Sequence, residues 1–287
     1  MNRIGIIGGS GLYELPGLTD TRWVACSTPW GAPSDELLLG TLGDIPLAFL
    51  PRHGRGHRIP PGEVNYRANI AALKSLGVAD VISLSAVGSL RMDLAPGAFV
   101  VVDQFIDRTT QRASSFFGSG LAAHVAMAHP VCSRIGAHLH HTLGKLGVPH
   151  VRGGTYVCIE GPQFSSLAES QLYRSWNADV IGMTNMPEAK LAREAELCYA
   201  SVAMVTDFDT WHPEHDAVTV AAVIQVLLGN AGHARELVVG VAAALAQDTH
   251  APNCACRRAL DHALITAPAA RAPGMVDKLR GIAGRVL

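Results

Sequence analysis

The feature that most constrains the fold is the stretch from 184 to 211, TNMPEAKLAREAELCYASVAMVTDFDTW. Pro187 indicates the start of a helix, because Pro is favoured in the first turn. The apolar run 199–205 is short enough for a buried strand, and Asp207 and Asp209 follow it directly. Ligands of open α/β sheets bind beyond the carboxyl ends of strands. The stretch therefore predicts both a fold class and a place for chemistry.

Strand-like and helix-like segments alternate along the rest of the chain. Apolar runs predict strands over 3–8, 46–51, 80–85, 99–102, 154–159, 180–183 and 199–205. Helical patterns cover 65–76, 133–146, 166–177 and 187–196, the region after 218, and shorter segments over 261–266 and 275–286. This alternation predicts an α/β fold with a central mixed β-sheet flanked by helices. Without a convincing linker, we expect one domain over 1–287, with C-terminal helices from about residue 250.

Charge and hydropathy exclude several classes of partner. The net charge of −1 carries no basic excess for nucleic acid, and no polybasic or amphipathic segment indicates a membrane. The longest apolar stretch, 237–246, is too short to span a bilayer. The N-terminus enters a strand-like run at once and does not resemble a signal peptide. We therefore expect a cytoplasmic protein.

The cysteines and histidines raise the question of a metal. Four of the six cysteines are scattered among apolar residues, which is typical of reduced, packed thiols. Cys254 and Cys256 form a C-x-C pair, but no second pair follows at zinc-like spacing, so two ordinary thiols are expected and a disulfide stays open. Pro213 breaks the spacing between His212 and His215, and no third ligand is evident. The sequence predicts no metal site.

Two loops after strands are candidate anion sites. In Gly8-Gly9-Ser10-Gly11, turn amides and a hydroxyl can hold phosphate, although a structural turn fits equally well. A dinucleotide site would need a following helix, which Pro16 and Gly17 interrupt. Residues 52–58, RHGRGHR, contain three arginines and two histidines. The arginine fork matches phosphate, so we favour anion binding here over a solvated charge cluster.

Two further strand ends carry weaker signals. The small residues of Ser85-Ala86-Val87-Gly88-Ser89 allow a ligand to approach the backbone closely. In the segment 160–164, EGPQF, Phe164 could stack on a planar ligand, although Phe is more often in the core. The loop 107–130 is long enough to indicate a function or contact with a partner.

Together these segments resemble the nucleoside phosphorylase family, and within it the 5′-methylthioadenosine phosphorylase branch, which is similar to trimeric purine nucleoside phosphorylases. The matching segments run in order from residue 4 to about 227: GIIGGSGLYELPGL, PRHGRGHRIPPGEVNYRANIAALKSLGV, SAVGSL, VVDQFIDRTT, YVCIEGPQFSSLAES and MTNMPEAKLAREAELCYASVAMVTDFDTW. The resemblance implies a nucleoside phosphorylase-like fold. It also implies phosphorolysis of a purine nucleoside, with inorganic phosphate as co-substrate and no cofactor.

The resemblance also implies roles for individual residues. The phosphate site would comprise Ser10, Arg52, His53, Ala86 and Thr184. Met183 would lie against the ribose and Phe164 against the base, while the pocket for the 5′-substituent would comprise Val220, Val223 and Ile224. His124 would reach a neighbouring subunit's site, which implies a homotrimer. The family usually has Cys where this chain has Val87, and a larger residue than Gly182, which predicts a wider base pocket.

Asp207 and Asp209 would face the purine, whose N7 needs a proton as the glycosidic bond breaks through an oxocarbenium-like state. Asp207 is the candidate acid, because burial beside another carboxylate favours its protonated form; capping a following turn is its structural alternative. A carboxylate also accepts hydrogen bonds from a 6-amino group, which favours adenine. A 6-oxopurine or 5′-methylthioinosine phosphorylase, a nucleosidase that uses water and a non-catalytic nucleoside-binding protein remain alternatives.

Overall fold

One mixed sheet runs through the protein. The computed structural model describes residues 3–9, 12, 14–212 and 219–287. Its strands are β1 (Arg3–Gly8), β2 (Leu18–Val24), β3 (Leu37–Leu42), β4 (Ile45–Pro51), β5 (Val78–Ser89), β6 (Phe99–Val102), β7 (Gln104–Asp107), β8 (His150–Arg152), β9 (Thr155–Cys158), β10 (Val180–Gly182) and β11 (Cys198–Asp207). They follow the order β2-β3-β4-β1-β5-β10-β9-β7, while β11 pairs with β5 and β6, and β8 pairs with β6.

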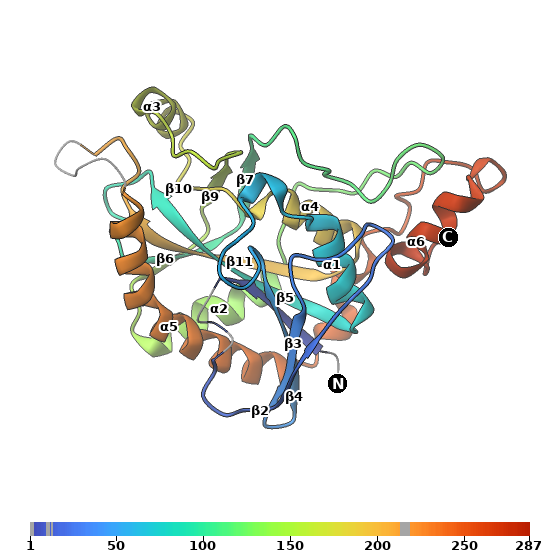
Figure 1. The fold of residues 1–287 in the computed structure, drawn as a ribbon, viewed down its shortest axis with the longest axis horizontal. Helices are drawn as coiled ribbons and strands as arrows, with labels where there is room; N and C mark the ends of the chain where they lie inside the picture. The colour runs from blue at the N-terminus through green and yellow to red at the C-terminus, as the bar shows by residue number, and fades with distance from the viewer. Residues whose placement is uncertain (1–2, 10–11, 13, 213–218) are drawn as a thin grey trace.

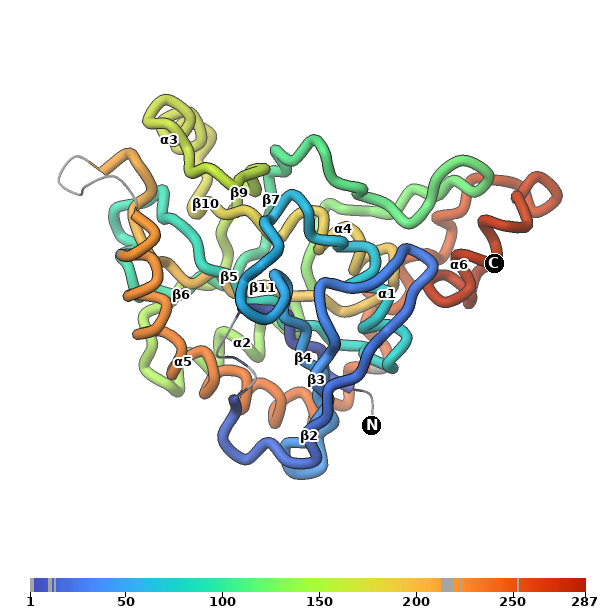
Figure 2. Tube along the Cα trace, in the orientation of Figure 1, coloured from blue at the N-terminus to red at the C-terminus, as the bar shows by residue number. Residues whose placement is uncertain are grey.

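Helices cover both faces of this sheet (Figure 1). They are α1 (Tyr66–Ser75), α2 (Ser133–Leu146), α3 (Leu167–Ser175), α4 (Asn185–Glu194), α5 (Val220–Ala246) and α6 (Pro273–Ala283), with short 3-10 helices at Pro61–Glu63, Ala251–Asn253, Ala255–Arg258 and Pro268–Ala270. Helices α2 and α5 pack on β11 and cover one face of the sheet, and α1 and α4 cover the other face. Figure 2 shows α6 beside the long loop that precedes α2.

Local sequence signals account for the helix ends. The Asn65 side chain accepts a hydrogen bond from the Ala68 amide at the start of α1. A capping box joins Ser166 and Glu169 at the start of α3, and Gly147 ends α2 with a left-handed φ of 66°. These devices satisfy backbone groups that a helix leaves unpaired at its ends. They explain why the predicted helices agree closely with the observed ones.

The predicted strands between residues 3 and 205 are present, although β5 is longer than expected and β2, β3, β7 and β8 were not foreseen. β2 reads LTDTRWV, without apolar alternation, because it lies at the edge of the sheet with one largely exposed face. The predicted helix over 261–266 is wrong. Leu264 pairs with Ala123 instead, and the Ile265 amide donates to the Ala122 carbonyl at 3.0 Å.

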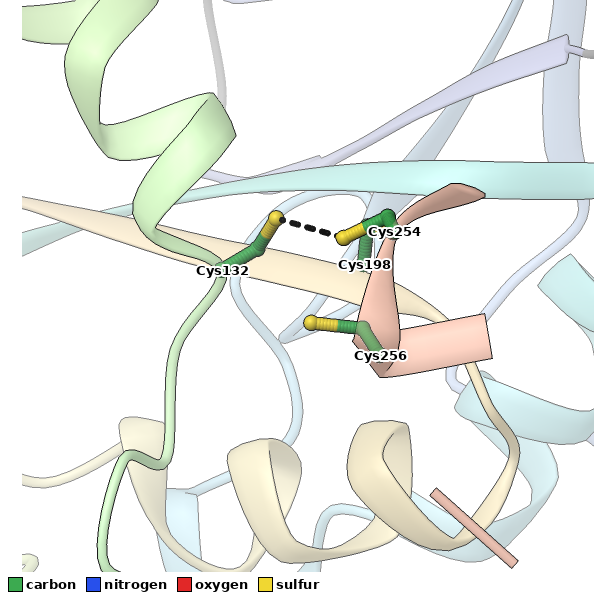
Figure 3. A group of neighbouring side chains, drawn as sticks. All are labelled: Cys132, Cys198, Cys254 and Cys256. Atoms are coloured by element: carbon green, nitrogen blue, oxygen red, sulfur yellow. Dashed lines mark hydrogen bonds between the residues drawn. The ribbon is translucent and has the colours of Figure 1, made fainter. Parts of the chain in front are cut away.

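The cysteines are also arranged differently from the expectation. The thiols of Cys132, Cys198, Cys254 and Cys256 lie together at the amino end of β11, with all four sulfur atoms within 4.8 Å of one another (Figure 3). The thiols are free and largely buried, as expected, but the sequence analysis did not foresee their clustering, because packing brings together residues that are far apart in the sequence. Among the described residues, no helix combines the length and apolar character that crossing a bilayer requires.

Candidate active site

The candidate site lies at the sheet edge where parallel strands end. Strands β1, β4, β5 and β11 run in the same direction, so their carboxyl ends meet there. Arg52 follows β4, and its amide donates to the Gly8 carbonyl of β1 at 3.0 Å. Ala86 and Asp207 lie in the paired ends of β5 and β11. Ser10, the remaining strand-end residue of the predicted phosphate site, lies outside the described residues.

Arg52 is buried and paired with a carboxylate that the sequence analysis did not single out. Its Nε donates to Glu188 Oε2 at 2.8 Å and its Nη2 to Oε1 at 3.0 Å, and both side chains are at most 2% exposed. Further bonds run from Nη1 to the Leu84 carbonyl and from Nη2 to Ser83. Burial opposes the guanidinium charge, but Glu188 raises the pKa of Arg52 above its ordinary value. Arg52 therefore keeps its positive charge, and these hydrogen bonds fix the position of its guanidinium group.

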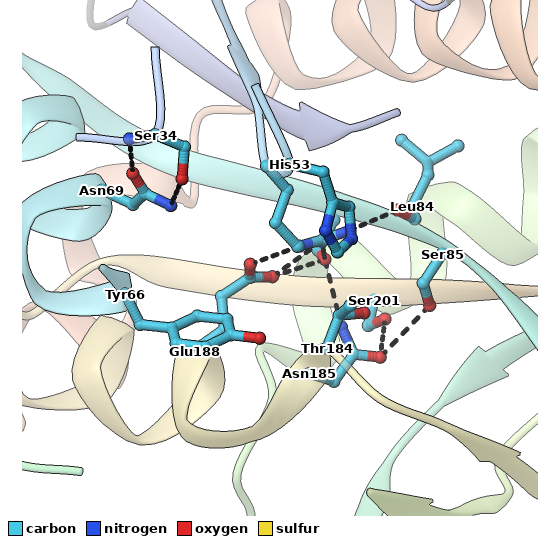
Figure 4. A network of polar contacts seen from close by, with 12 residues as sticks. Ser34, His53, Tyr66, Asn69, Leu84, Ser85, Thr184, Asn185, Glu188 and Ser201 are labelled. Carbon is cyan, nitrogen blue, oxygen red and sulfur yellow. Dashed lines mark hydrogen bonds and ion pairs between the residues drawn. The ribbon is translucent and has the colours of Figure 1, made fainter. Parts of the chain in front are cut away.

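A buried hydrogen-bond network fixes this ion pair. Glu188 Oε1 accepts from Ser83 at 2.7 Å and from the Tyr199 hydroxyl at 2.9 Å. The Asn185 amide donates to Ser83 and Tyr199, and its oxygen accepts from Ser201 at 2.9 Å. Figure 4 shows Asn185, Glu188 and Ser201 of this network grouped with His53 and Thr184. A satisfied network of this kind rigidifies its surroundings.

The outer arginines of the loop 52–58 are paired with carboxylates. Arg55 binds the buried Asp35 carboxylate at 2.8 Å and Glu36 at 2.9 Å, and Arg58 lies 3.6 Å from Asp35. These pairs fix the loop rather than leave cations for a ligand. The loop contributes Arg52 and His53 to the sheet edge.

His53 is a neutral imidazole with one free acceptor position. Burial, and then the charge of Arg52, lower the pKa of His53 to about 4. Its Nδ1 lies 2.8 Å from the Ile59 carbonyl oxygen, which can only accept, so Nδ1 carries the proton. The ring stacks on His57 with centroids 4.2 Å apart. At neutral pH, Nε2 is thus an acceptor that suits a hydroxyl of a protonated phosphate rather than its charged oxygens.

Thr184 provides an unpaired donor at the start of α4. The residue is 7% exposed, and its Oγ1 is buried without a hydrogen-bond partner among the described residues. A buried hydroxyl without a partner is costly in a folded protein, and a bound ligand would remove that cost. Ala86, on β5, is half-buried and pairs with Met204 of β11.

Asp207 is held in a defined orientation at the end of β11. Its Oδ2 accepts from the Thr206 hydroxyl at 2.7 Å, and its Oδ1 accepts from the Asp209 amide at 2.8 Å. The second bond confirms the turn-capping role that the sequence left open. Burial raises the pKa of Asp207, while both hydrogen bonds favour its ionised form. The backbone of Gly88 passes closely, since a Cβ there would lie 2.9 Å from Asp207 Oδ1.

Asp209 is the carboxyl that retains its proton more readily. Burial, with a smaller contribution from the charge of Asp207, raises the pKa of Asp209 to about 6. The residue is 6% exposed and has a left-handed φ of 51°, a conformation that a non-glycine residue adopts at some cost. A proton donor with a pKa near 6 is well matched to work close to neutral pH.

A cavity lies between the segment 159–165 and α3. It has a volume of about 280 Å³, and Phe164 on its wall is 43% exposed, so Phe164 is not a core residue. Its other lining residues are Arg108, Ile159, Glu160, Gly161, Gln163, Ser165, Glu169 and Tyr173. Glu169 on its wall contributes to the raised pKa of Asp209, after burial and the charge of Asp207. Ser165 carries a second buried hydroxyl without a partner among the described residues.

Met183 is half-buried against the cavity wall, because a Cβ at Gly161 would lie 2.5 Å from the Met183 sulfur. The neighbouring Gly182 does not widen the pocket, contrary to expectation. A Cβ at that position would lie 2.1 Å from the Tyr156 hydroxyl, so Tyr156 already fills the space. Val87 also contacts this space, because a Cβ added at Gly182 would lie 3.2 Å from Val87 Cγ1.

Two groups of predicted residues lie at the surface of the single chain. Val220 is 62% and Ile224 48% exposed, and Val223 is half-buried, so this apolar face of α5 is uncovered. His124 is exposed in the long loop, and its amide donates to the Ala263 carbonyl at 2.9 Å. The loop is thus anchored to the C-terminal segment.

Sequence reasoning missed Arg112, which ties the site's loops together. Its side chain is 1% exposed and binds Glu160 at 2.6 Å. It also donates to the carbonyls of Met183 and Met186, both at 2.7 Å. The Glu160 carboxylate in turn accepts from the amides of residues 110 and 111. A lone arginine in a long loop carries no local signal of such a role.

The chain matches proteins of known activity along almost its whole length. The model of the phosphorylase superfamily matches residues 3–243. The S-methyl-5′-thioadenosine phosphorylase of Cereibacter sphaeroides is 61% identical over 284 residues, 99% of this chain and 98% of that protein. That of Rhodospirillum rubrum is 58% identical over 99% of this chain and 97% of its own length.

Solved structures agree with these relatives. A methylthioadenosine phosphorylase from an antarctic soil metagenomic library has a TM-score of 0.92 and 48% identity, covering 97% of this chain and 98% of that one. The Schistosoma mansoni methylthioadenosine phosphorylase in complex with adenine has a TM-score of 0.85 and 38% identity, covering 90% and 96%. The expected fold class is therefore confirmed.

Proposed function

Because the chain belongs to the phosphorylase superfamily, we propose that it catalyses the phosphorolysis of 5′-methylthioadenosine to adenine and 5-methylthioribose 1-phosphate. This reaction is a pentosyl transfer that serves purine and methionine salvage. Inorganic phosphate is the second substrate, and the proposal includes no cofactor. The pair of carboxyls at the end of β11, one with a pKa raised to about 6, is the observation that carries it, because it suits protonation of a leaving purine.

On the phosphate side, we assign the anion to the sheet edge between β4, β5 and α4. The Thr184 hydroxyl has no partner among the described residues, and neutral His53 can accept from the hydroxyl of monohydrogen phosphate. Arg52 supplies a positive charge that Glu188 and Ser83 hold in place. Phosphate bound here would stabilise the oxocarbenium-like sugar and then form the new bond to C1′.

On the base side, the two aspartates divide the work. Asp207, whose carboxylate already accepts two hydrogen bonds, is suited to remain ionised and to accept from the 6-amino group. Asp209 is suited to supply the proton to N7, because its pKa is the more strongly raised. The sequence analysis named Asp207 as the acid. We propose instead that Asp209 carries the proton and that Asp207 binds the 6-amino group. Phe164 and Met183 would contact base and ribose.

The test is release of base from 5′-methylthioadenosine with and without inorganic phosphate, alongside 5′-methylthioinosine. We expect phosphate-dependent release of adenine, with 5-methylthioribose 1-phosphate identified by phosphorus NMR and little hypoxanthine from the inosine analogue. Equal rates without phosphate would establish a hydrolase. Faster release of hypoxanthine would keep the phosphorylase but refute Asp207 as the group that selects adenine.

Thr184→Ala is expected to raise the KM for phosphate by about tenfold or more. Hydrogen bonds to charged groups contribute ~1.5–3 kcal/mol, and the unpartnered Thr184 hydroxyl is suited to form one. Steady-state kinetics with phosphate varied at saturating nucleoside would measure the change. Thr184→Ser keeps the hydroxyl and should stay near the wild-type value; equal KM values for all three proteins would show that Thr184 does not bind phosphate.

We also propose that the protein is a homotrimer in which His124 and the exposed face of α5 complete a neighbouring site. The exposure of His124, Val220 and Ile224 in the single chain supports this arrangement. His124→Ala should raise the nucleoside KM about 2- to 10-fold, the value of one hydrogen bond, while sedimentation still reports a trimer. A monomeric wild-type protein with full activity would contradict the proposal.

A further inference from the structure

The four clustered cysteines come from three separate segments. Cys132 immediately precedes α2, and Cys198 is the first residue of β11. Cys254 and Cys256 lie in the segment between α5 and α6. All are free thiols, and the sulfur atoms of Cys132 and Cys254 are 3.6 Å apart. Figure 3 shows the side chains directed toward a common centre.

This geometry matches a tetrahedral metal site. Zinc binds thiolates at ~2.3 Å, which places the sulfur atoms of a tetrahedral site about 3.8 Å apart. The sulfur atoms here all lie within 4.8 Å of one another, so small side-chain rotations would bring them to that spacing. Four soft sulfur donors in this arrangement select zinc over oxygen-preferring ions such as magnesium. We propose that Cys132, Cys198, Cys254 and Cys256 bind one zinc ion, and this proposal replaces the sequence-based expectation of no metal.

The surroundings indicate a structural site rather than a catalytic one. Cys132, Cys198 and Cys256 are buried and Cys254 is half-buried. Four protein ligands leave no open position for water or substrate, which is the mark of structural zinc. The cluster lies at the amino end of β11, whereas Asp207 lies at the carboxyl end. The zinc therefore takes no part in phosphorolysis.

Two arginines near the cluster are paired with carboxylates. Zinc with four thiolates carries a net charge of −2, and the thiol protons leave to solvent on binding. Asp80, which is in register with Cys198 on the neighbouring strand, binds Arg134 at 2.6 Å and Arg257 at 3.4 Å. Arg134 also binds Asp248 at 3.1 Å. The two arginines therefore leave no net positive charge at the cluster.

The ion would fasten the C-terminal segment to the sheet. The link joins the start of β11 and the start of α2 to a segment of short 3-10 helices that follows α5. That segment continues to α6, which packs beside α1. Zinc would thus hold the end of the chain in place.

The test is metal content after expression under reducing conditions and incubation with zinc. We expect about one zinc ion per chain after gel filtration, and cobalt in its place should give the intense visible bands of a tetrahedral thiolate site. Cys198→Ser and the double variant Cys254→Ser/Cys256→Ser should lose both signals. The matched control is Cys26→Ser, because Cys26 is a half-buried thiol outside the cluster, and it should keep them.

Three outcomes would overturn the proposal. The first is a reduced, folded wild-type chain that retains no zinc, and the second is a cluster variant that retains as much zinc as the control. The third is a thiol titration of the unfolded, metal-free protein without reductant that detects only the two cysteines outside the cluster, which would show two disulfides instead. A chelator should also lower the Tm of the wild type and of Cys26→Ser but leave Cys198→Ser unchanged, a readout independent of activity.

Discussion

Asp209→Asn is expected to lower kcat for adenine release by about 10²–10⁴-fold, the range that a single positioned proton donor contributes. The amide keeps the shape of the carboxyl but cannot deliver a proton to the leaving base. Asp209 is buried, and its pKa is raised to about 6, so a useful fraction is protonated near neutral pH. The KM for 5′-methylthioadenosine should change less than kcat, because the proton moves only as the bond breaks.

The pH profile separates a proton donor from a structural residue. A required acid with a pKa of about 6 is protonated below that pH and loses its proton above it. The wild-type kcat/KM should therefore fall toward tenfold per unit as the pH rises above about 6. The Asp209→Asn enzyme should not show this decrease in kcat/KM with rising pH. Asp207→Asn should move it to lower pH, because the charge of Asp207 helps to raise the pKa of Asp209.

Asp277→Asn is the matched control for these variants. Its side chain is 70% exposed on α6, where it pairs only with the exposed Arg280, so activity and pH profile should stay at wild-type values. Circular dichroism would confirm that all variants fold. An Asp209→Asn enzyme with a wild-type rate and an unchanged pH profile would remove Asp209 from the mechanism.

Glu188→Gln is expected to lower the free energy of unfolding by about 3–5 kcal/mol, the cost of leaving one partner of a buried ion pair unpaired. Arg52 and Glu188 are at most 2% exposed, so water cannot replace the lost carboxylate. The amide keeps one acceptor oxygen for Ser83 and Tyr199, but its NH2 group replaces the oxygen that accepts from Arg52 Nε. Urea denaturation monitored by tryptophan fluorescence would measure the shift in midpoint.

Two further variants separate folding from function at this position. Glu36→Gln breaks an ion pair with Arg55 in which both side chains are 43% exposed. It should lower the free energy of unfolding by no more than ~1 kcal/mol. The double variant Arg52→Met/Glu188→Leu replaces both charges and should recover much of the stability, yet fail to use phosphate. A Glu188→Gln protein as stable as Glu36→Gln would contradict the account of the buried pair.

The sequence predicted the elements of this fold well because their signals are local. The observed α2 and β6 have the predicted bounds of 133–146 and 99–102, since apolar periodicity and flanking breakers lie within a few residues. The place of Asp207 and Asp209 at a strand end followed from the same kind of pattern. The helix expected over 261–266 failed because a contact with Ala123, distant in the sequence, replaced the local preference.

By itself, then, the sequence determined the alternation of strands and helices, the family resemblance and the strand ends that carry the candidate site. Only the tertiary structure decided which partners these residues have. Arg52 meets Glu188 across 136 positions, Arg112 binds the backbone of distant loops, and four cysteines of three segments meet at one point. Such contacts depend on how strands register and how helices pack on them, and no local pattern of residues encodes either directly.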